Sequence, residues 1–156
     1  MPRSSSLRRL ALAAATVVAL SVTPSLHAQG SPRQPVVPKG MSVSATLTPG
    51  IRIGDVVYSS GQLGLRRENP DTTIQGQTRL ALDNIKAVFE AAGTTMAHAA
   101  KCTVFLIDVK DFGGMNQAYR EYFPDSPPAR STVVVAALVV PNAKVEIECH
   151  AVMPGK

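Results

Sequence analysis

The chain has 156 residues, of which 45% are hydrophobic, so it is long enough for one ordinary domain and too short for two. Aromatic residues make up 4% of the chain and tryptophan is absent, which argues against a stacking platform for single-stranded nucleic acid. The formal net charge is +5, but three arginines fall within the first nine residues, and the rest of the chain has 13 basic against 11 acidic residues, a net +2. So small a charge does not indicate a nucleic-acid or anionic-membrane partner.

The amino terminus has the layout of a secretory signal peptide. Three arginines precede an apolar run from Leu10 to Leu20, and Ala28 then offers a small residue for cleavage. The run is shorter than the roughly 20 apolar residues that span a bilayer. We therefore expect residues 1–28 to be removed, rather than kept as a membrane anchor or a basic tail. The mature protein would begin at Gln29, lack a stable membrane anchor, and be periplasmic or secreted.

Residues 29–41 contain Pro32, Pro35 and Pro38, which predicts an extended, flexible lead-in. We expect the folded domain over residues 42–156. Its first elements are predicted to be extended segments joined by a tight turn at Gly54-Asp55, forming a β-hairpin. The segments are Val43–Leu47, Ile51–Ile53 and Val56–Ser59.

Apolar residues between Ile74 and Ala92 recur at three- and four-residue steps, which predicts an amphipathic helix. Residues 71–73 supply capping oxygens and Gly93 supplies a stop. A strand is predicted over Cys102–Val109, and Asp111 is expected to cap a second helix. The apolar face of that helix would hold Phe112, Met115, Tyr119 and either Tyr122 or Phe123.

The run Thr132–Leu138 is rich in β-branched residues, which lose side-chain freedom in a helix and fit a pleated surface. It predicts an inner strand, covered on both faces by helices or by another subunit because it lacks polar alternation. After a turn at Pro141-Asn142 a last strand is predicted. Its apolar face would carry Val145, Ile147 and Cys149, and its other face Glu146, Glu148 and His150.

Cys102 and Cys149 both fall in predicted strands. A disulfide is open to them in an oxidising compartment if their Cα atoms lie within about 7 Å, which sequence does not show. Buried free thiols are the expected state, and the spacing gives no metal-site pattern. The histidines at 98 and 150 sit beside no recognisable nucleophile motif.

The element order ββαβαββ predicts an α+β sandwich in which right-handed crossovers put both helices on one face of one mixed sheet. A single copy would leave the other sheet face uncovered. We therefore expect self-association to bury that face.

The stretch PARSTVVVAALVVPNAKVEIE resembles the signature of the reactive-intermediate deaminase A family, RidA or YjgF, in which an arginine leads one strand and a glutamate opens the next. Further segments stand in family order, so that the resemblance spans about residues 50 to 152. They are residues 54–62, 81–93, 103–108 and 116–123. The resemblance implies a chorismate-mutase-like fold and a homotrimer with sites in the clefts between subunits.

The resemblance also implies a site. Arg130 would hold the substrate carboxylate and Glu146 would position or activate water, with Gly61, Asn116 and Thr132 contacting the substrate. From pattern alone, Arg130 could be a salt-bridged edge arginine, the usual fate of an arginine at a strand start, and a solvated carboxylate is the better interpretation of Glu146; the resemblance reverses that order. The family often has Tyr and Cys where this chain has Leu47 and Thr132, which implies an altered substrate size or lost turnover, with small-carboxylate binding retained.

The implied activity is that of an enamine/imine deaminase, which hydrolyses 2-imino acids to 2-keto acids and ammonia. The chain has no nucleotide fingerprint, phosphate loop or metal cluster, so the chemistry is expected to need neither cofactor nor metal. The alternative is a non-catalytic trimer that binds small carboxylates or acts like a chaperone. Export makes this alternative a serious one, because reactive imines arise mainly from cytoplasmic cofactor chemistry and an exported member would meet other substrates.

Overall fold

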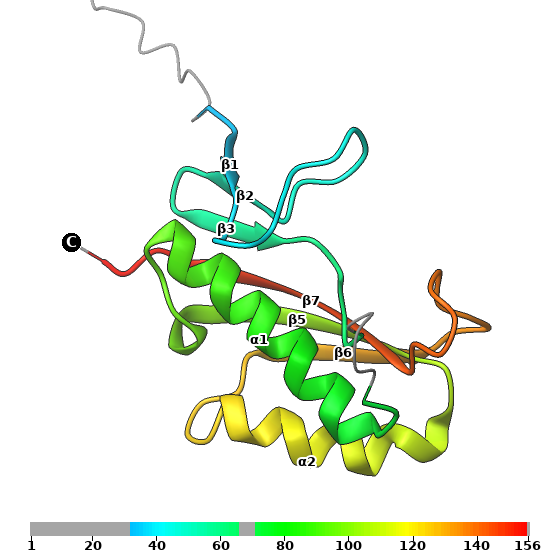
Figure 1. Cartoon of the computed structure of the whole chain (residues 1–156). Helices are drawn as coiled ribbons and strands as arrows, with labels where there is room; N and C mark the ends of the chain where they lie inside the picture. Colours follow the sequence, from blue (N-terminus) through cyan, green and yellow to red (C-terminus); the bar gives the residue numbers. More distant parts are fainter. Residues whose placement is uncertain (1–31, 66–70, 156) are drawn as a thin grey trace, which may run out of the picture. The chain divides into compact units, whose positions relative to one another are not determined.

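The computed structural model describes residues 32–65 and 71–155 (Figure 1). The predicted signal peptide, its cleavage site at Ala28 and the new terminus at Gln29 lie outside the described residues. No helix of the described part is long and apolar enough to cross a membrane. The elements are β1 (Gln34–Val36), β2 (Gly50–Ile53), β3 (Val56–Ser59), β4 (Gln62–Leu63), α1 (Ile74–Ala92), β5 (Ala99–Leu106), α2 (Phe112–Tyr122), β6 (Ala129–Val134) and β7 (Val145–Val152), with short 3-10 turns at Met96–His98 and Val109–Asp111.

The strands form one mixed seven-stranded sheet in the order β1-β2-β3-β7-β5-β6, with β4 paired to β7. Only β5 and β6 run parallel, and helix α2 makes the crossover that a parallel pair requires. Both helices lie on the same side of the sheet (Figure 1). The predicted α+β architecture and its ββαβαββ order are therefore confirmed, with β1 and β4 as short additions.

Helix α1 has the predicted bounds, because local signals at both ends are strong. The Thr73 side chain accepts a hydrogen bond from the Gly76 N–H, and Gly93 at the carboxyl end has a φ of +89°, which glycine adopts without steric cost. At α2, Asp111 occupies the N-cap position, but its side chain makes no capping hydrogen bond. Asp108 instead accepts from the Lys110 N–H and closes the preceding 3-10 turn.

The core lies between the helices and one face of the sheet. On β7, the predicted alternation is confirmed, since Val145, Ile147 and Cys149 are buried while the intervening side chains are half-buried. The largest fully buried side chains come from α1, α2 and the central strands. They include Phe89, Leu82, Ile85, Leu106, Met115 and Ile147.

Two expectations about the amino-terminal part are corrected. Within the expected flexible lead-in, Gln34–Val36 form β1, which pairs antiparallel with β2. Conversely, Val43–Leu47 form no strand, because the Ser44 hydroxyl accepts a hydrogen bond from the Leu47 N–H at 3.0 Å and closes a bend.

The expectation of an inner strand over Thr132–Leu138 is wrong for the single subunit. Strand β6 ends at Val134 and lies at the edge of the sheet, paired only with β5. Val133 and Val134 are 44% and 52% exposed. The β-branched residues do favour a strand, but the crossover through α2 sets its place, and that place is outside β5.

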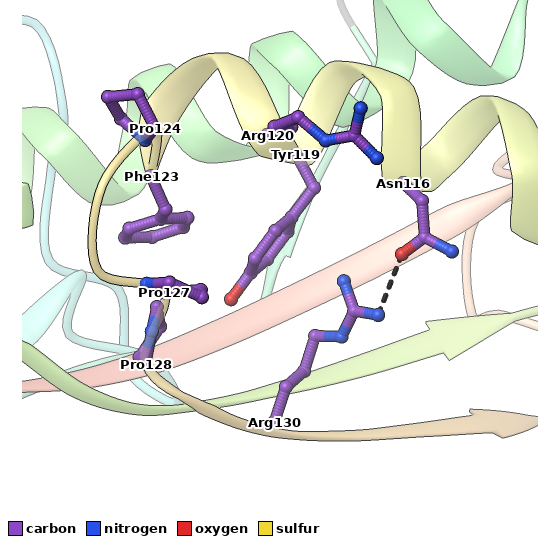
Figure 2. Close-up of a pocket in the computed structure, with 8 residues that line it drawn as sticks. All are labelled: Asn116, Tyr119, Arg120, Phe123, Pro124, Pro127, Pro128 and Arg130. Carbon is purple, nitrogen blue, oxygen red and sulfur yellow. Dashed lines mark hydrogen bonds between the residues drawn. The ribbon is translucent and has the colours of Figure 1, made fainter.

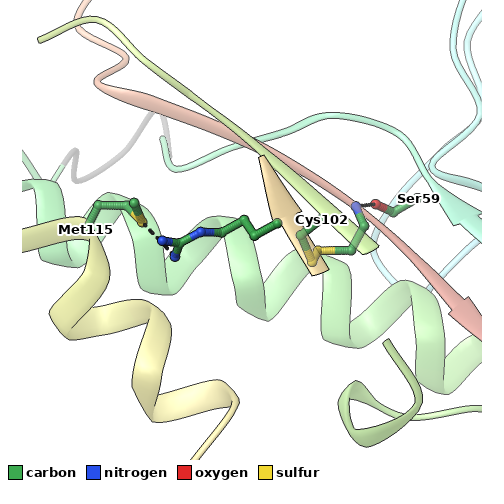
Figure 3. Close-up of a disulfide and its surroundings, with 5 residues drawn as sticks. Ser59, Cys102 and Met115 are labelled. Carbon is green, nitrogen blue, oxygen red and sulfur yellow. Dashed lines mark hydrogen bonds between the residues drawn. A yellow bond between two sulfur atoms is a disulfide. The ribbon is translucent and has the colours of Figure 1, made fainter. Parts of the chain in front are cut away.

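The expectation of free thiols is also wrong, because Cys102 and Cys149 form a disulfide (Figure 3). They lie directly opposite each other in the antiparallel β5–β7 pairing, with 4.1 Å between their Cα atoms. Both are buried on the helix side of the sheet, and the Cys149 N–H donates to the Ser59 hydroxyl at 3.0 Å. The pairing register brings the two sulfur atoms together.

Candidate functional site

Arg130 lies on β6 and points to the helix side of the sheet (Figure 2). It pairs in register with Cys102, which is buried under the helices, and residues opposite each other in adjacent strands share a face. Its Nη2 donates to the Asn116 Oδ1 at 2.7 Å. Its guanidinium carbon lies 4.6 Å from the centre of the Tyr119 ring, a cation–π contact.

The half-buried Arg130 guanidinium forms no salt bridge with any described residue. In residues 32–65 and 71–155, the salt bridges involve Arg52, Arg79, Lys86 and Lys144 but not Arg130. Among the described residues, Arg130 is therefore not the salt-bridged edge arginine of the alternative interpretation. A guanidinium offers a planar fork of donors that matches a carboxylate. Asn116 accepts from Nη2, and the Met115 sulfur accepts a weak hydrogen bond from Nη1 at 3.9 Å, which leaves the other donors of the fork for a ligand.

A pocket of about 480 Å³ opens beside this guanidinium, within the size range of small-molecule sites. Its wall on α2 consists of residues spaced i, i+3, i+4 and i+7, which share one face of a helix. The lining residues are Asn116, Tyr119, Arg120, Phe123, Pro124, Pro127, Pro128 and Arg130 (Figure 2). Two guanidinium groups thus line the pocket, with no carboxylate among the lining residues.

Sequence reasoning missed Tyr119 and Arg120 as site residues and assigned Tyr119 to the apolar core. Tyr119 is a buried residue that lines the pocket, and its hydroxyl is buried and makes no hydrogen bond to any described residue (Figure 2). Burial raises the pKa of Tyr119 to about 12, against an opposing effect of Arg130. The hydroxyl therefore stays protonated at neutral pH. Helical spacing from Asn116 is the signal that identifies both residues.

Thr132 and Leu47 stand outside this pocket. Thr132 shares the helix-side face with Arg130, two residues along β6, and its buried hydroxyl has no partner in the described part of the chain. It does not line the pocket. Leu47 is 49% exposed in the bend closed by Ser44, and it is not a lining residue either.

Glu146 lies on the opposite face of the sheet. Its neighbours in β7 are buried under the helices, and it pairs across the sheet with Phe105 and Leu63. It lines a shallow hollow of about 220 Å³ with Phe105 and residues of the loop 135–139. Burial, and then repulsion by Glu148, raises the pKa of the Glu146 carboxyl above its usual value.

Gly61 belongs with Glu146 rather than with Arg130. A Cβ atom added at Gly61 would overlap the Glu146 carboxylate, so a side chain at this position would displace that carboxylate from its present place. The predicted site residues thus form two groups in one subunit. Arg130 and Asn116 are brought together on the helix side, while Glu146 and Gly61 meet on the other side, with β5 lying between β6 and β7.

Comparisons with known proteins identify the family. The family model described as Endoribonuclease L-PSP matches residues 39–153. The mitochondrial protein mmf2 of Schizosaccharomyces pombe is 34% identical over 120 residues, 75% of this chain and 95% of that protein. A protein of Dermatophagoides farinae named 2-iminobutanoate/2-iminopropanoate deaminase is 42% identical over 101 residues, 63% of this chain and 78% of that protein.

The crystal structure of the YjgF gene product from E. coli superimposes with a TM-score of 0.70 and 32% identity, covering 76% of this chain and 98% of that one. Both the sequence and the fold therefore agree with the resemblance seen in the motifs. The chain belongs to the RidA/YjgF family.

Proposed function

We propose that this protein is an imine deaminase that hydrolyses 2-imino acids to 2-keto acids and ammonia. The observation that carries the proposal is the half-buried Arg130 guanidinium, which is held by Asn116 beside a pocket and has no carboxylate partner in the described chain. Membership of a family that includes a relative named as an imine deaminase adds support.

Arg130 binds the substrate carboxylate through two parallel hydrogen bonds, which fixes the imine carbon relative to the protein. Water adds its oxygen to that carbon while a carboxylate accepts a proton from it. That proton passes to nitrogen and gives a carbinolamine. The hydroxyl group of the carbinolamine then gives its own proton to nitrogen through the same carboxylate, and the C–N bond breaks with both electrons leaving on ammonia. The keto acid keeps the water oxygen, so neither oxidant nor reductant is consumed.

Glu146 is the proposed proton acceptor, and it acts from a neighbouring copy of the chain. Within one subunit it faces away from Arg130, so a complete site requires two copies. Strand β6 pairs with β5 on one side only, and its Val133 and Val134 side chains are exposed, a surface that association would cover. We propose a homotrimer, the assembly implied by the family. The raised pKa of Glu146 makes its carboxylate a stronger proton acceptor than an ordinary glutamate.

Export is part of the proposal. A disulfide linking two strands of the core is typical of proteins that fold in an oxidising compartment. It agrees with the signal-peptide layout of residues 1–28 and with a periplasmic or secreted protein. Intact-mass measurement should find a mature chain beginning at Gln29 outside the cytoplasm, whereas cytosolic protein that retains Met1 contradicts export.

Non-catalytic binding of small carboxylates is the second candidate function. It is favoured by the fact that Arg130, Asn116 and the pocket are complete in one subunit, whereas Glu146 lies apart. Binding would therefore need one subunit, whereas turnover would need two.

One assay tests the first candidate against the second. Purified mature protein is mixed with 2-iminopropanoate generated by an amino-acid oxidase, and ammonia release is followed against the spontaneous rate. Deamination predicts a clear acceleration that depends on Arg130. An unaccelerated rate, together with measurable 2-keto acid binding, supports the binding function and rejects the enzyme.

A further inference from the structure

The geometry points to a substrate class: Arg120 binds a second carboxylate and makes this pocket selective for 2-imino dicarboxylic acids over monocarboxylic ones. The inference rests on the proposed function, in which Arg130 holds the carboxylate next to the imine. It adds Arg120 as a specificity-determining residue and a second carboxylate at the far end of the substrate.

The placement of Arg120 follows from the helix. Arg120 is four residues after Asn116, and Asn116 accepts the hydrogen bond from Arg130. Residues at this spacing lie one turn apart on the same face of a helix. Arg120 and Arg130 therefore line one pocket from two different elements, α2 and β6 (Figure 2).

Neither guanidinium is neutralised by the described part of the chain. Its salt bridges include neither Arg120 nor Arg130, and no acidic residue lines the pocket. Arg79 provides the contrast within the same molecule, because it forms two hydrogen bonds to Glu121 at 2.7 and 2.8 Å. The helix surface thus pairs Arg79 with an acid and leaves Arg120 free at the pocket.

Two positive charges in one hollow repel each other while it is empty, and a single carboxylate compensates only one of them. A dicarboxylate compensates both. The Tyr119 ring lines the same pocket and lies against the Arg130 guanidinium, 4.6 Å from its carbon, so it holds that charge in place at the pocket. An exposed arginine on a helix is usually only solvated, but here the concave wall and the second guanidinium give it a ligand to bind.

The test uses two product-like acids of equal chain length, 2-oxoglutarate and 2-oxopentanoate, which differ in the second carboxylate. Their Kd values are measured by calorimetry on wild type, Arg120→Gln and Lys110→Gln. Lys110→Gln is the matched control, because Lys110 is an exposed cation outside the pocket and its loss changes the net charge equally.

We expect wild type to bind 2-oxoglutarate about tenfold more tightly, the lower end for a charge-assisted hydrogen bond because Arg120 is exposed. Arg120→Gln should bring the two Kd values together by weakening 2-oxoglutarate alone, and Lys110→Gln should keep the preference. Equal Kd values in wild type, a preference that survives Arg120→Gln, or no binding of either acid would each overturn the inference.

The ammonia assay separates this inference from the proposed function. A dicarboxylate preference that depends on Arg120, without accelerated ammonia release from any imine, leaves the inference standing and rejects the enzyme. Accelerated release from 2-iminopropanoate without that preference supports the enzyme and overturns the inference.

Discussion

The two faces of the sheet are built differently. On the helix side, α2 reaches over β6, so Arg130 has a hydrogen-bond partner, an aromatic ring against its guanidinium and a pocket beside it within one chain. On the other side, Glu146 is half-buried beside Gly61 and Phe105, and both helices of residues 71–155 lie on the opposite side of the sheet.

The difference teaches that the proposed carboxylate binding and the proposed proton transfer can be tested separately. The proposed binding uses contacts within one subunit, whereas the proposed chemistry also uses a carboxylate supplied across an interface. Substitutions on the Glu146 face should therefore change turnover, and substitutions on the Arg130 face should change ligand affinity.

The largest expected effect is on the face that carries Glu146. Glu146→Gln keeps the shape of the side chain but removes its proton acceptor, so turnover should fall by roughly 10²–10⁴-fold, the usual contribution of general acid–base catalysis. The Kd for a 2-keto acid should not change, because Arg130 and its partners are intact. Single-turnover kinetics and calorimetry on the same preparation measure the two quantities.

A loss of affinity equal to the loss of turnover would contradict the separation of the two faces. Glu146→Asp serves as the control, because it retains a carboxylate at a shorter reach and should keep part of the activity.

The next effect concerns the helix-side face itself. Replacing both cysteines, Cys102→Ala with Cys149→Ala, removes a cross-link between residues 47 apart in sequence. For a loop of that length the free energy of unfolding should fall by about 3–5 kcal/mol, chiefly because the unfolded chain gains freedom. Urea titration measures the change, and the m value should rise because the unfolded state becomes less compact.

Wild type unfolded in the presence of a reductant should approach the double variant. If iodoacetamide alkylates both cysteines of wild type in denaturant without reductant, the chain has no disulfide and the prediction fails.

Arg130→Lys should have a smaller effect, and it should change the Kd for the ligand. The charge remains, but a single ammonium cannot make two parallel hydrogen bonds, and the stacking over Tyr119 is lost. Loss of one charge-assisted hydrogen bond, about 1.5–3 kcal/mol, predicts a Kd for 2-keto acids that is roughly tenfold higher or more. Unchanged affinity would show that Arg130 does not hold the carboxylate.

Local features of this fold could be predicted from sequence. Helix α1 begins and ends where Thr73 and Gly93 place it, because cap residues act over a few neighbours. The alternation on β7 also follows from residue type, since the two sides of a strand repeat every second residue. The motifs identified Arg130, Asn116, Glu146 and Gly61 as candidates. In the structure Arg130 contacts Asn116, and Glu146 lies against Gly61.

Features that depend on strand order could not be predicted in this way. The disulfide requires knowing that Cys102 and Cys149 share a register, and the exposure of Val133 requires knowing that β6 is an edge. The separation of Arg130 from Glu146 has the same cause, because β5 is inserted between two strands that follow each other in the chain. Arg120, by contrast, could have been found by helical spacing from Asn116.

The smallest expected effect is a shift in pH dependence on the Glu146 face. Burial and then Glu148 raise the pKa of Glu146, so Glu148→Gln should lower it part of the way back and leave the effect of burial. If Glu146 acts as a base in the free enzyme, the acid limb of kcat/KM should move to lower pH in this variant.

The stability of the same variant gives an independent check with a fixed sign. A carboxyl whose pKa is higher in the folded than in the unfolded state stabilises the fold while it is protonated, and that contribution is lost as pH rises through the folded pKa. Wild type should therefore lose stability as pH rises from the ordinary glutamate pKa, 4.5, through the raised value, and Glu148→Gln should lose less. Urea titrations at several pH values measure both slopes. Because assembly would bury Glu146 further, the shift should be larger at protein concentrations where copies associate, and a shift independent of concentration would argue against Glu146 lying at an interface.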